Sequence, residues 1–374
     1  MPRIRTLGLL SHHWPTGAHN AITDVAGVAV GQVTILKGEG EWQRGQGPFR
    51  TGVTVILPHQ GNLYENKVPA AVHTINGFGK AVGFEQIREL GNIETPIALT
   101  STLNVPRVAD ALITLAIEQS PHIGVGFAEN GRLGWGSVNP VVGETNDGFL
   151  NDMQGRPVGL AEVRQAIAAA STDAVGEGAV GAGTGTSCYG WKGGIGTASR
   201  ALPTNQGGYV VGALVQTNFG RPEELVIDGV PIGRFLHPDH HSPRTEDGSI
   251  MIVLATNAPM NGRQLKRLCK RATFGLARTG STCHGGSGDF VIAFSTAHHI
   301  PDHPASRQTT QSFLYEQSIM SAFARATAEA VEEAIYNSLF MAETVIGRDG
   351  NTRVGLPVAE VVRLVQETTN ATHL

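Results

Sequence analysis

Short runs of apolar and β-branched residues recur along the chain, and glycine, asparagine, aspartate or proline bounds most of them. This pattern is typical of strands, because such side chains fill a pleated surface while the bounding residues favour turns. The first third contains two of these runs, at residues 27–35 and 52–58. Three more occur at residues 207–218, 249–256 and 288–296. We predict a strand at each of the five runs.

Other segments have the spacing of amphipathic helices. In residues 107–119, Val108, Leu112 and Leu115 share one face, and Pro106 suits an opening turn. Further helices are predicted at residues 84–90, 158–170 and 261–279, at 309–342 as one long helix or a broken pair, and as a short helix after Pro357. Strand blocks and helix blocks alternate, which favours a layered α+β fold or a sandwich over strict β–α–β repetition.

Composition narrows the class of protein. A chain of 374 residues suits one large domain or two ordinary ones, and 41% hydrophobic residues can form a substantial core. The formal charge of −4 gives no reason to expect nucleic acid or an anionic membrane as partner. No apolar stretch reaches the ~18 residues of a membrane span. Three cysteines without zinc-like spacing argue against a disulfide framework, so we expect a protein of the reducing cytoplasm.

Two motifs that could indicate cofactors are weak. The sequence "GEGAVG" at residues 176–181 fits the G-x-G-x-x-G pattern of dinucleotide-binding loops. That pattern needs a strand before it and an acidic residue about 20 positions later, and the next carboxylate, Glu223, comes far too late. We therefore interpret these glycines as packing and turn residues. The histidines are interpreted as solvated side chains and not as metal ligands, both at His237, His240 and His241 and at His298, His299 and His303. We expect no metal and no organic cofactor.

A polar, turn-prone segment, residues 237–248, meets the apolar strand directly at Gly248-Ser249. A serine hydroxyl at such a junction can attack the preceding carbonyl and convert the peptide into an ester, which water then hydrolyses. Glycine before the serine removes the Cβ that would hinder the attack. The cut would give Ser249 an α-amine with a pKa of about 7.7–8.0, so that one residue supplies both nucleophile and base. The junction alone leaves open an ordinary serine that begins a strand.

Seven ordered blocks resemble the DmpA-type L-aminopeptidase/D-amidase-esterase family, which includes the β-aminopeptidases. They lie at residues 19–31, 50–58, 76–83, 140–152, 181–200, 247–259 and 285–296, and so span nearly the whole chain. The resemblance implies an αββα four-layer sandwich like that of the Ntn hydrolases, with different strand connectivity. It also implies a single catalytic domain that cuts itself between Gly248 and Ser249 into residues 1–248 and 249–374.

The resemblance implies catalytic roles for four residues. Ser249 is the expected nucleophile and, through its new amine, the proton acceptor. Asn218 matches an asparagine that donates to the oxyanion. Ser287 and Asp289 match a serine–acid pair that orients the amine, although some relatives carry glutamate at the acid position.

Three further residues are expected to bind substrate. Glu144 matches the carboxylate that receives the substrate's ammonium group. Asn146 stands where at least some relatives have tyrosine, so a phenolic hydroxyl is missing there. Trp135 is expected to line the substrate pocket.

The implied function is an aminopeptidase that acts on short peptides, amides and esters with a free amino group through an acyl-enzyme. It needs no metal or cofactor and assembles as a homotetramer of processed heterodimers. An ornithine-type acetyltransferase is the nearest alternative, but that family uses threonine as its new N-terminal residue. A nucleotide-dependent oxidoreductase and an uncut ligand-binding protein are the alternatives from other classes.

Overall fold

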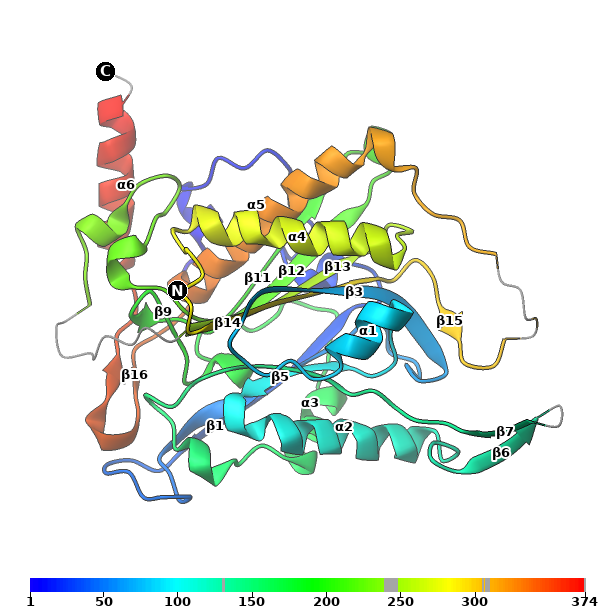
Figure 1. Ribbon diagram of the computed structural model, residues 1–374. Helices are drawn as coiled ribbons and strands as arrows, with labels where there is room; N and C mark the ends of the chain where they lie inside the picture. Colours follow the sequence, from blue (N-terminus) through cyan, green and yellow to red (C-terminus); the bar gives the residue numbers. More distant parts are fainter. Residues whose placement is uncertain (130–131, 239–247, 305, 307–309, 373–374) are drawn as a thin grey trace.

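The computed structural model describes residues 1–129, 132–238, 248–304, 306 and 310–372. Its main elements form four layers (Figure 1). Helices α4 (Gly262–Arg278) and α5 (Met320–Phe340) cover one face of a seven-stranded sheet. A four-stranded sheet packs on its other face, and α2 (Val105–Gln119) and α3 (Leu160–Ala168) cover that second sheet from outside. The predicted αββα sandwich of α+β class is confirmed.

The larger sheet contains the strands that carry most of the predicted catalytic residues. Its order is β11 (Ile195–Ala201), β12 (Val210–Asn218), β13 (Gly248–Thr256), β14 (Ser287–Ser295), β3 (Asn66–Gly77) and β15 (Ile300–Pro301), with β4 (Asn92–Ile93) also on β3. The smaller sheet runs β1 (Ala29–Lys37), β2 (Phe49–Leu57), β5 (Ile97–Ser101) and β8 (Val141–Thr145). Only β13–β14 and β5–β8 pair in parallel within these two sheets among the described residues.

Smaller elements complete the described chain. Helix α1 (Phe84–Leu90) contributes Phe84 and Ile87 to the core between the sheets. The two-residue or four-residue ribbons are β6 (Gly126–Glu129) with β7 (Arg132–Trp135), β9 (Ser187–Cys188) with β10 (Trp191–Lys192), and β16 (Val345–Ile346) with β17 (Thr352–Arg353). Helix α6 (Val358–Thr372) ends the described chain. No described helix has the length and apolar character needed to cross a membrane.

Strand β13 is buried on both faces, which explains its continuous apolar run. Ile250 and Ile252 belong to the core under α4 and α5, whereas Met251 and Val253 belong to the core between the two sheets. Because side chains alternate along a strand, Ser249 faces the same side as Met251. The nucleophile candidate therefore faces the space between the sheets.

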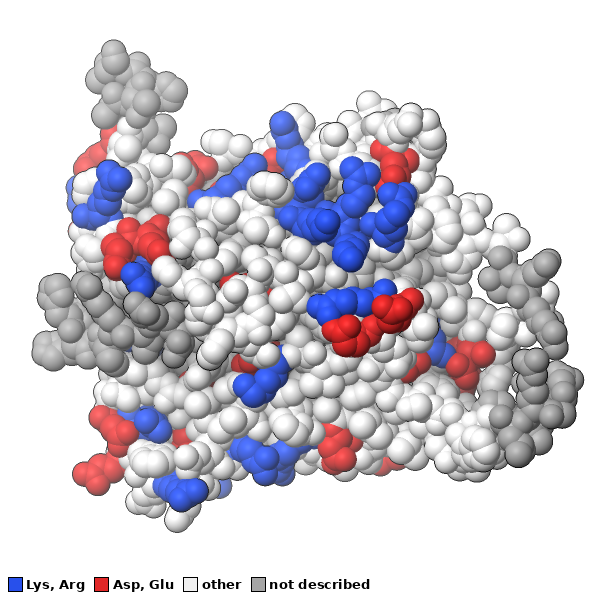
Figure 2. Space-filling view, viewed as in Figure 1, with Lys and Arg blue, Asp and Glu red and all other residues white. Residues whose placement is uncertain are grey.

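Helix α4 has two distinct faces. Its buried positions include Leu265, Leu268 and Leu276. Its outer face forms a cluster of cations (Figure 2), made of Arg263, Lys266, Arg267, Lys270 and Arg271. The overall negative charge of the chain does not reveal this local concentration of positive charge.

Two of the predicted helices are wrong in extent. The segment 309–342 is helical only from Met320, with a short 3-10 turn at Glu316–Ser318 before it. The backbone of Leu314 bonds to Pro259 and to the Gln264 side chain, so tertiary contacts replace the helical hydrogen bonds there. The helix after Pro357 has 15 residues and is not short.

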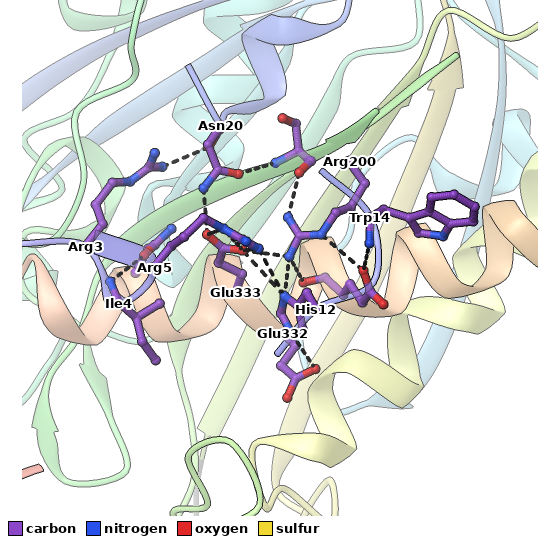
Figure 3. Close-up of polar contacts among 12 residues, drawn as sticks. Arg3, Ile4, Arg5, His12, Trp14, Asn20, Arg200, Glu332 and Glu333 are labelled. Carbon is purple, nitrogen blue, oxygen red and sulfur yellow. Dashed lines mark hydrogen bonds and ion pairs between the residues drawn. The ribbon is translucent and has the colours of Figure 1, made fainter. Parts of the chain in front are cut away.

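A buried charge network attaches the N-terminal segment to β11 and α5 (Figure 3). Arg200 and Glu333 are both fully shielded from solvent, and their Nη2 and Oε2 atoms are 2.6 Å apart. Arg5 donates to the same Oε2 atom at 2.6 Å. Burial opposes a charge on His12, but hydrogen bonds to Glu332 and Glu333 outweigh it and raise the His12 pKa. These contacts fix where α5 lies over β11.

Removal of Arg200 should destabilise the fold strongly. The substitution Arg200→Met leaves a buried carboxylate short of a partner, and breaking such a pair costs about 3–5 kcal/mol. We expect a loss of this size in the free energy of unfolding, measured by urea titration. The control is Arg164→Met, which removes the exposed Arg164–Glu118 pair and should change stability little because solvent screens it. Equal effects of the two substitutions would contradict the assignment.

Candidate active site

Strand pairing brings four of the predicted residues to one end of the larger sheet. Ser249 pairs with Asn218 of β12 on one side and with Gly288 of β14 on the other. Gly248 pairs with Ser287, and the residue after Ser249 pairs with Asp289. Three segments that are far apart in the sequence therefore meet at the Gly248–Ser249 peptide.

The hydroxyl of Ser249 lies against the carbonyl that self-cleavage would attack. Its Oγ atom donates a hydrogen bond to the Gly248 carbonyl oxygen at 2.5 Å, and the side chain is buried. A side chain at position 248 would be crowded by its neighbours. A Cβ there would lie 3.0 Å from the Phe219 Cα and 3.2 Å from the Asn218 carbonyl oxygen. The end of β12 would have to move by a few tenths of an ångström to admit it.

The side-chain amide of Asn218 is oriented by Ser187. Its Oδ1 atom accepts from the Ser187 backbone N–H at 3.0 Å and lies 3.3 Å from the Ser187 hydroxyl. An asparagine amide accepts only at oxygen and donates only at nitrogen. Because the oxygen is engaged by Ser187, the Nδ2 group is left to donate on the face shared with Ser249. This is the arrangement that an oxyanion donor needs.

Lys192 supports Ser187, and no sequence motif indicates this role. Lys192 pairs with Ser187 in the β9–β10 ribbon, and its side chain is fully buried. Its ammonium donates to the carbonyl oxygens of Gly183, Thr186 and Gly193 at 2.7–2.9 Å, which uses all three N–H bonds. Burial lowers the pKa of Lys192 to about 7. A lysine inside the glycine-rich "GWKGG" was the available signal.

Ser287 and Asp289 form a buried hydrogen-bonded pair. The Ser287 hydroxyl donates to Asp289 Oδ1 at 2.6 Å, and Asp289 Oδ2 is shielded from solvent. Burial raises the pKa of Asp289, and the hydrogen bond from Ser287 opposes the rise. Strand alternation puts this pair on the face opposite the Ser249 side chain. It therefore borders the Gly248–Ser249 backbone and not the Ser249 hydroxyl.

Glu144 reaches this group from the smaller sheet. It is buried at the end of β8, and its Oε1 atom accepts from the Lys80 backbone N–H at 2.9 Å. Burial raises the pKa of Glu144, although the Lys80 N–H opposes the rise. A methyl group on Gly79 would lie 3.0 Å from Glu144 Oε1 and 3.2 Å from the Gly288 Cα. Gly79 therefore lies between the Glu144 carboxylate and β14, the strand that pairs with Ser249.

Asn146 and Trp135 were also predicted to bind substrate, but their observed contacts are with other parts of the chain. Asn146 is exposed, and its Oδ1 atom accepts from the Gly148 N–H at 2.9 Å in a local turn. Trp135 ends the β6–β7 hairpin with 67% of its surface exposed, and its indole lies over Gly126. The hairpin extends from the side of the molecule opposite β9 (Figure 1). A place for Trp135 in the substrate pocket stays a prediction.

The glycine-rich motif has a packing role. Gly178 and Gly181 both have left-handed φ values, and a Cβ on them would meet the Met341 carbonyl oxygen at 2.3 Å and Thr54 Oγ1 at 2.4 Å. A short 3-10 turn, Gly181–Gly183, follows where a dinucleotide loop would need a helix. Of the first predicted histidine group, His240 and His241 lie outside the described residues.

Comparison with known proteins identifies the family. The model of the family described as "Peptidase family S58" matches residues 20–353. The chain belongs to that family. It is similar to the β-peptidyl aminopeptidase BapA of Sphingosinicella microcystinivorans, with 39% identity over 98% of this chain and 92% of that protein.

Two solved structures are similar over nearly the full length. The PH0078 protein of Pyrococcus horikoshii has 46% identity and a TM-score of 0.91, covering 98% of this chain and 99% of its own. The L-aminopeptidase D-Ala-esterase/amidase of Ochrobactrum anthropi has 36% identity and a TM-score of 0.88, covering 99% of each chain. The latter is described as a prototype of the serine aminopeptidases with a variant of the Ntn hydrolase fold. The present chain is accordingly an aminopeptidase, a hydrolase of peptide bonds with this N-terminal-nucleophile fold.

Proposed function

We propose that this aminopeptidase cuts itself between Gly248 and Ser249 and then uses Ser249 as its nucleophile. The observation that carries the proposal is the Ser249 hydroxyl against the Gly248 carbonyl, with Asn218 paired beside it. In the cut, Oγ bonds to the Gly248 carbonyl carbon while the peptide nitrogen leaves and takes a proton. Water then hydrolyses the resulting ester. The products are residues 1–248, ending in a carboxylate, and 249–374, beginning with a free amine.

In turnover the same hydroxyl attacks the substrate. The α-amine of Ser249 takes the hydroxyl proton, and the substrate's leaving amine takes a proton in its turn. Asn218 Nδ2 donates to the oxyanion that forms, an interaction worth about 3–4 kcal/mol in comparable sites. Water then releases the aminoacyl group from Ser249. Ser287 and Asp289 border the backbone of residue 249, so their role is to orient the new amine.

Glu144 is the proposed receptor for the substrate's amino group. A buried carboxylate one glycine away from β14 can pair with an ammonium that enters beside Ser249. Substrates with a blocked amine would leave this carboxylate unpaired, which is unfavourable for a buried charge. Asn146 offers no phenolic hydroxyl, so Asn218 would stabilise the oxyanion without that help.

Short peptides, amides and esters with a free amino group are the substrates we propose. The name of the Sphingosinicella relative makes β-peptides a class to include in any substrate panel. We also propose assembly as a homotetramer of processed heterodimers and a location in the cytoplasm.

Loss of the Ser249 hydroxyl should abolish both reactions. We expect Ser249→Ala to remain one polypeptide of 39.4 kDa without aminopeptidase activity, while the wild type gives two polypeptides by intact-mass measurement. The matched control is Ser137→Ala, which changes the exposed serine of another Gly-Ser pair and should leave the cut unaffected. A Ser249→Ala protein that is still cut at this junction would refute self-processing.

Loss of the Glu144 charge should selectively impair substrates with a free amine. Hydrogen bonds to charged groups contribute about 1.5–3 kcal/mol, so Glu144→Gln should lower kcat/KM about 10- to 100-fold. In the wild type, kcat/KM should fall as the pH drops through the raised Glu144 pKa, because the protonated carboxyl no longer attracts the ammonium.

The matched control for this test is Glu41→Gln, which changes an exposed glutamate. Protonation of the Ser249 α-amine should lower kcat/KM in every variant, so the test is the additional fall that belongs to Glu144: it should be lost in Glu144→Gln and kept in the control. An acidic limb in Glu144→Gln that is unchanged from that of the wild type would remove the proposed role of Glu144.

A further inference from the structure

Against the sequence expectation that His303 is solvated and binds no metal, we propose that His122, Asp302 and His303 form a divalent metal site, with zinc as the favoured ion. Each of the three residues offers one ligand atom, and these atoms all lie within 4.8 Å of one another. The site lies away from the proposed nucleophile. Pro301 pairs with Asn66 at one end of β3, whereas Asp289 pairs with Asn76 at the other end. Ten strand residues separate these ends by about 33 Å.

The spacing of the polar atoms fits tetrahedral zinc. Bonds of about 2.0–2.1 Å to nitrogen and oxygen place neighbouring ligand atoms about 3.3 Å apart in a tetrahedron. His303 Nε2 lies 3.4 Å from Asp302 Oδ2, and His122 Nε2 lies 3.5 Å from Glu65 Oε1. Small side-chain rotations would therefore complete the coordination. The fourth position is open to Glu65 or to water.

The Nε2 atom of His122 supplies an independent observation. This atom is shielded from solvent and makes no hydrogen bond to the described residues, although the side chain as a whole is 42% exposed and the atom lies 3.5 Å from Glu65 Oε1. A shielded polar atom without a hydrogen bond is unfavourable, and native structures rarely leave one without a reason. Coordination of a metal through the imidazole lone pair would satisfy this nitrogen.

Hydrogen bonds hold the two sides of the site together before any ion binds. The Asp302 backbone N–H donates to the Glu65 carbonyl oxygen at 2.9 Å. On the other side, the Asn62 amide donates to the Ser120 hydroxyl at 2.8 Å, which itself donates to Glu65 Oε1 at 3.2 Å. The turn that carries His122 and the segment that carries Asp302 are thus fixed to the same residue. A preorganised site loses little freedom when an ion binds.

The charges around the site favour a cation. Glu65, Glu94 and Asp302 contribute three carboxylates, and Lys67 contributes one ammonium, which contacts Asp302 Oδ1 and lies 3.7 Å from Glu94. With neutral histidines, two negative charges remain to be neutralised. Lys67 uses Oδ1, which leaves Oδ2 of Asp302 for the ion. Two imidazole nitrogens with one carboxylate suit zinc better than magnesium or calcium, which prefer oxygen ligands alone.

The ion would join two distant segments of the chain. His122 lies in residues 1–248, whereas Asp302 and His303 lie in residues 249–374. Zinc bound here would connect the two polypeptides that the proposed cut produces. The site itself does not depend on the cut, because the same residues are together in the continuous chain.

Zinc binding to the full-length protein tests this site. After removal of metals with a chelator, we expect calorimetric titration with zinc chloride to show one zinc per chain. His122→Ala and His303→Ala should each weaken binding at least about tenfold, since loss of even an outer partner of a ligand costs about 10- to 100-fold. The matched control is His298→Ala, whose ring bonds to the Ser312 carbonyl and which should bind zinc like the wild type.

Two further readouts separate a specific site from a general effect. Cobalt chloride added to the metal-free wild type should give the intense visible absorption of tetrahedral cobalt, and His122→Ala should not. Circular dichroism of each variant establishes that it is folded, and zinc should raise the Tm of the wild type but not of His122→Ala. The proposal is overturned if folded His122→Ala and His303→Ala bind zinc as tightly as the wild type, or if the wild type binds none.

Discussion

The pairing of β13 with β12 on one side and β14 on the other is the constraint on which the candidate site depends. Backbone hydrogen bonds along these strands set which residues lie opposite one another, and a shift by one residue would turn each side chain to the other face. In the observed register, Asn218 and Gly288 flank Ser249. The two cores that pack on β13 hold this register. A shift by one residue in either direction would move each apolar side chain of the strand from its own core to the opposite one.

The candidate catalytic groups lie on opposite faces of the larger sheet. The Ser249 hydroxyl and the Asn218 amide lie on the side between the sheets. The Glu144 carboxylate lies beside Gly79, which itself packs against Gly288. The Ser287–Asp289 pair lies on the side of the helices and borders the backbone at residue 249. An N-terminal nucleophile needs such a division, because its hydroxyl and its amine act as separate groups. The glycines at 79 and 248 keep these parts close, since a Cβ at either position would meet a neighbour at about 3 Å.

Much of the layered fold could be predicted from the sequence. Doubly buried β13 reads as an unbroken apolar run, and α2 and α4 show helical spacing with suitable ends. Strand β3 was not predicted, although it pairs with β14 on one side and with β4 and β15 on the other. Pro69 interrupts its pattern and cannot donate to a ladder. The structure tolerates this proline because the pairing of β3 with β14 ends at Ala70.

The candidate site was less accessible to sequence reasoning than the fold. The Gly248-Ser249 junction stands out locally, but the positions of Asn218, Glu144 and Asp289 followed only from family resemblance. Their proximity results from strand pairing and from the segment around Gly79, which no local pattern encodes. No local pattern predicts the closeness of His122 and His303 either. Their ring centroids are 6.0 Å apart because the fold brings two distant segments together. The only local sign of Lys192 was a lysine within a glycine-rich segment, and such a sign does not reveal which backbone carbonyls the buried ammonium will contact.

The central claim is that Ser249 carries the acyl group during turnover, and trapping that group tests it most directly. The processed enzyme would be mixed with an aminoacyl ester and quenched rapidly with acid. Intact mass and peptide mapping would then locate the added aminoacyl group. The account predicts that it is found on Ser249, at the start of residues 249–374, and that residues 1–248 are unmodified. An aminoacyl group on residues 1–248, or on another side chain of 249–374, would contradict it.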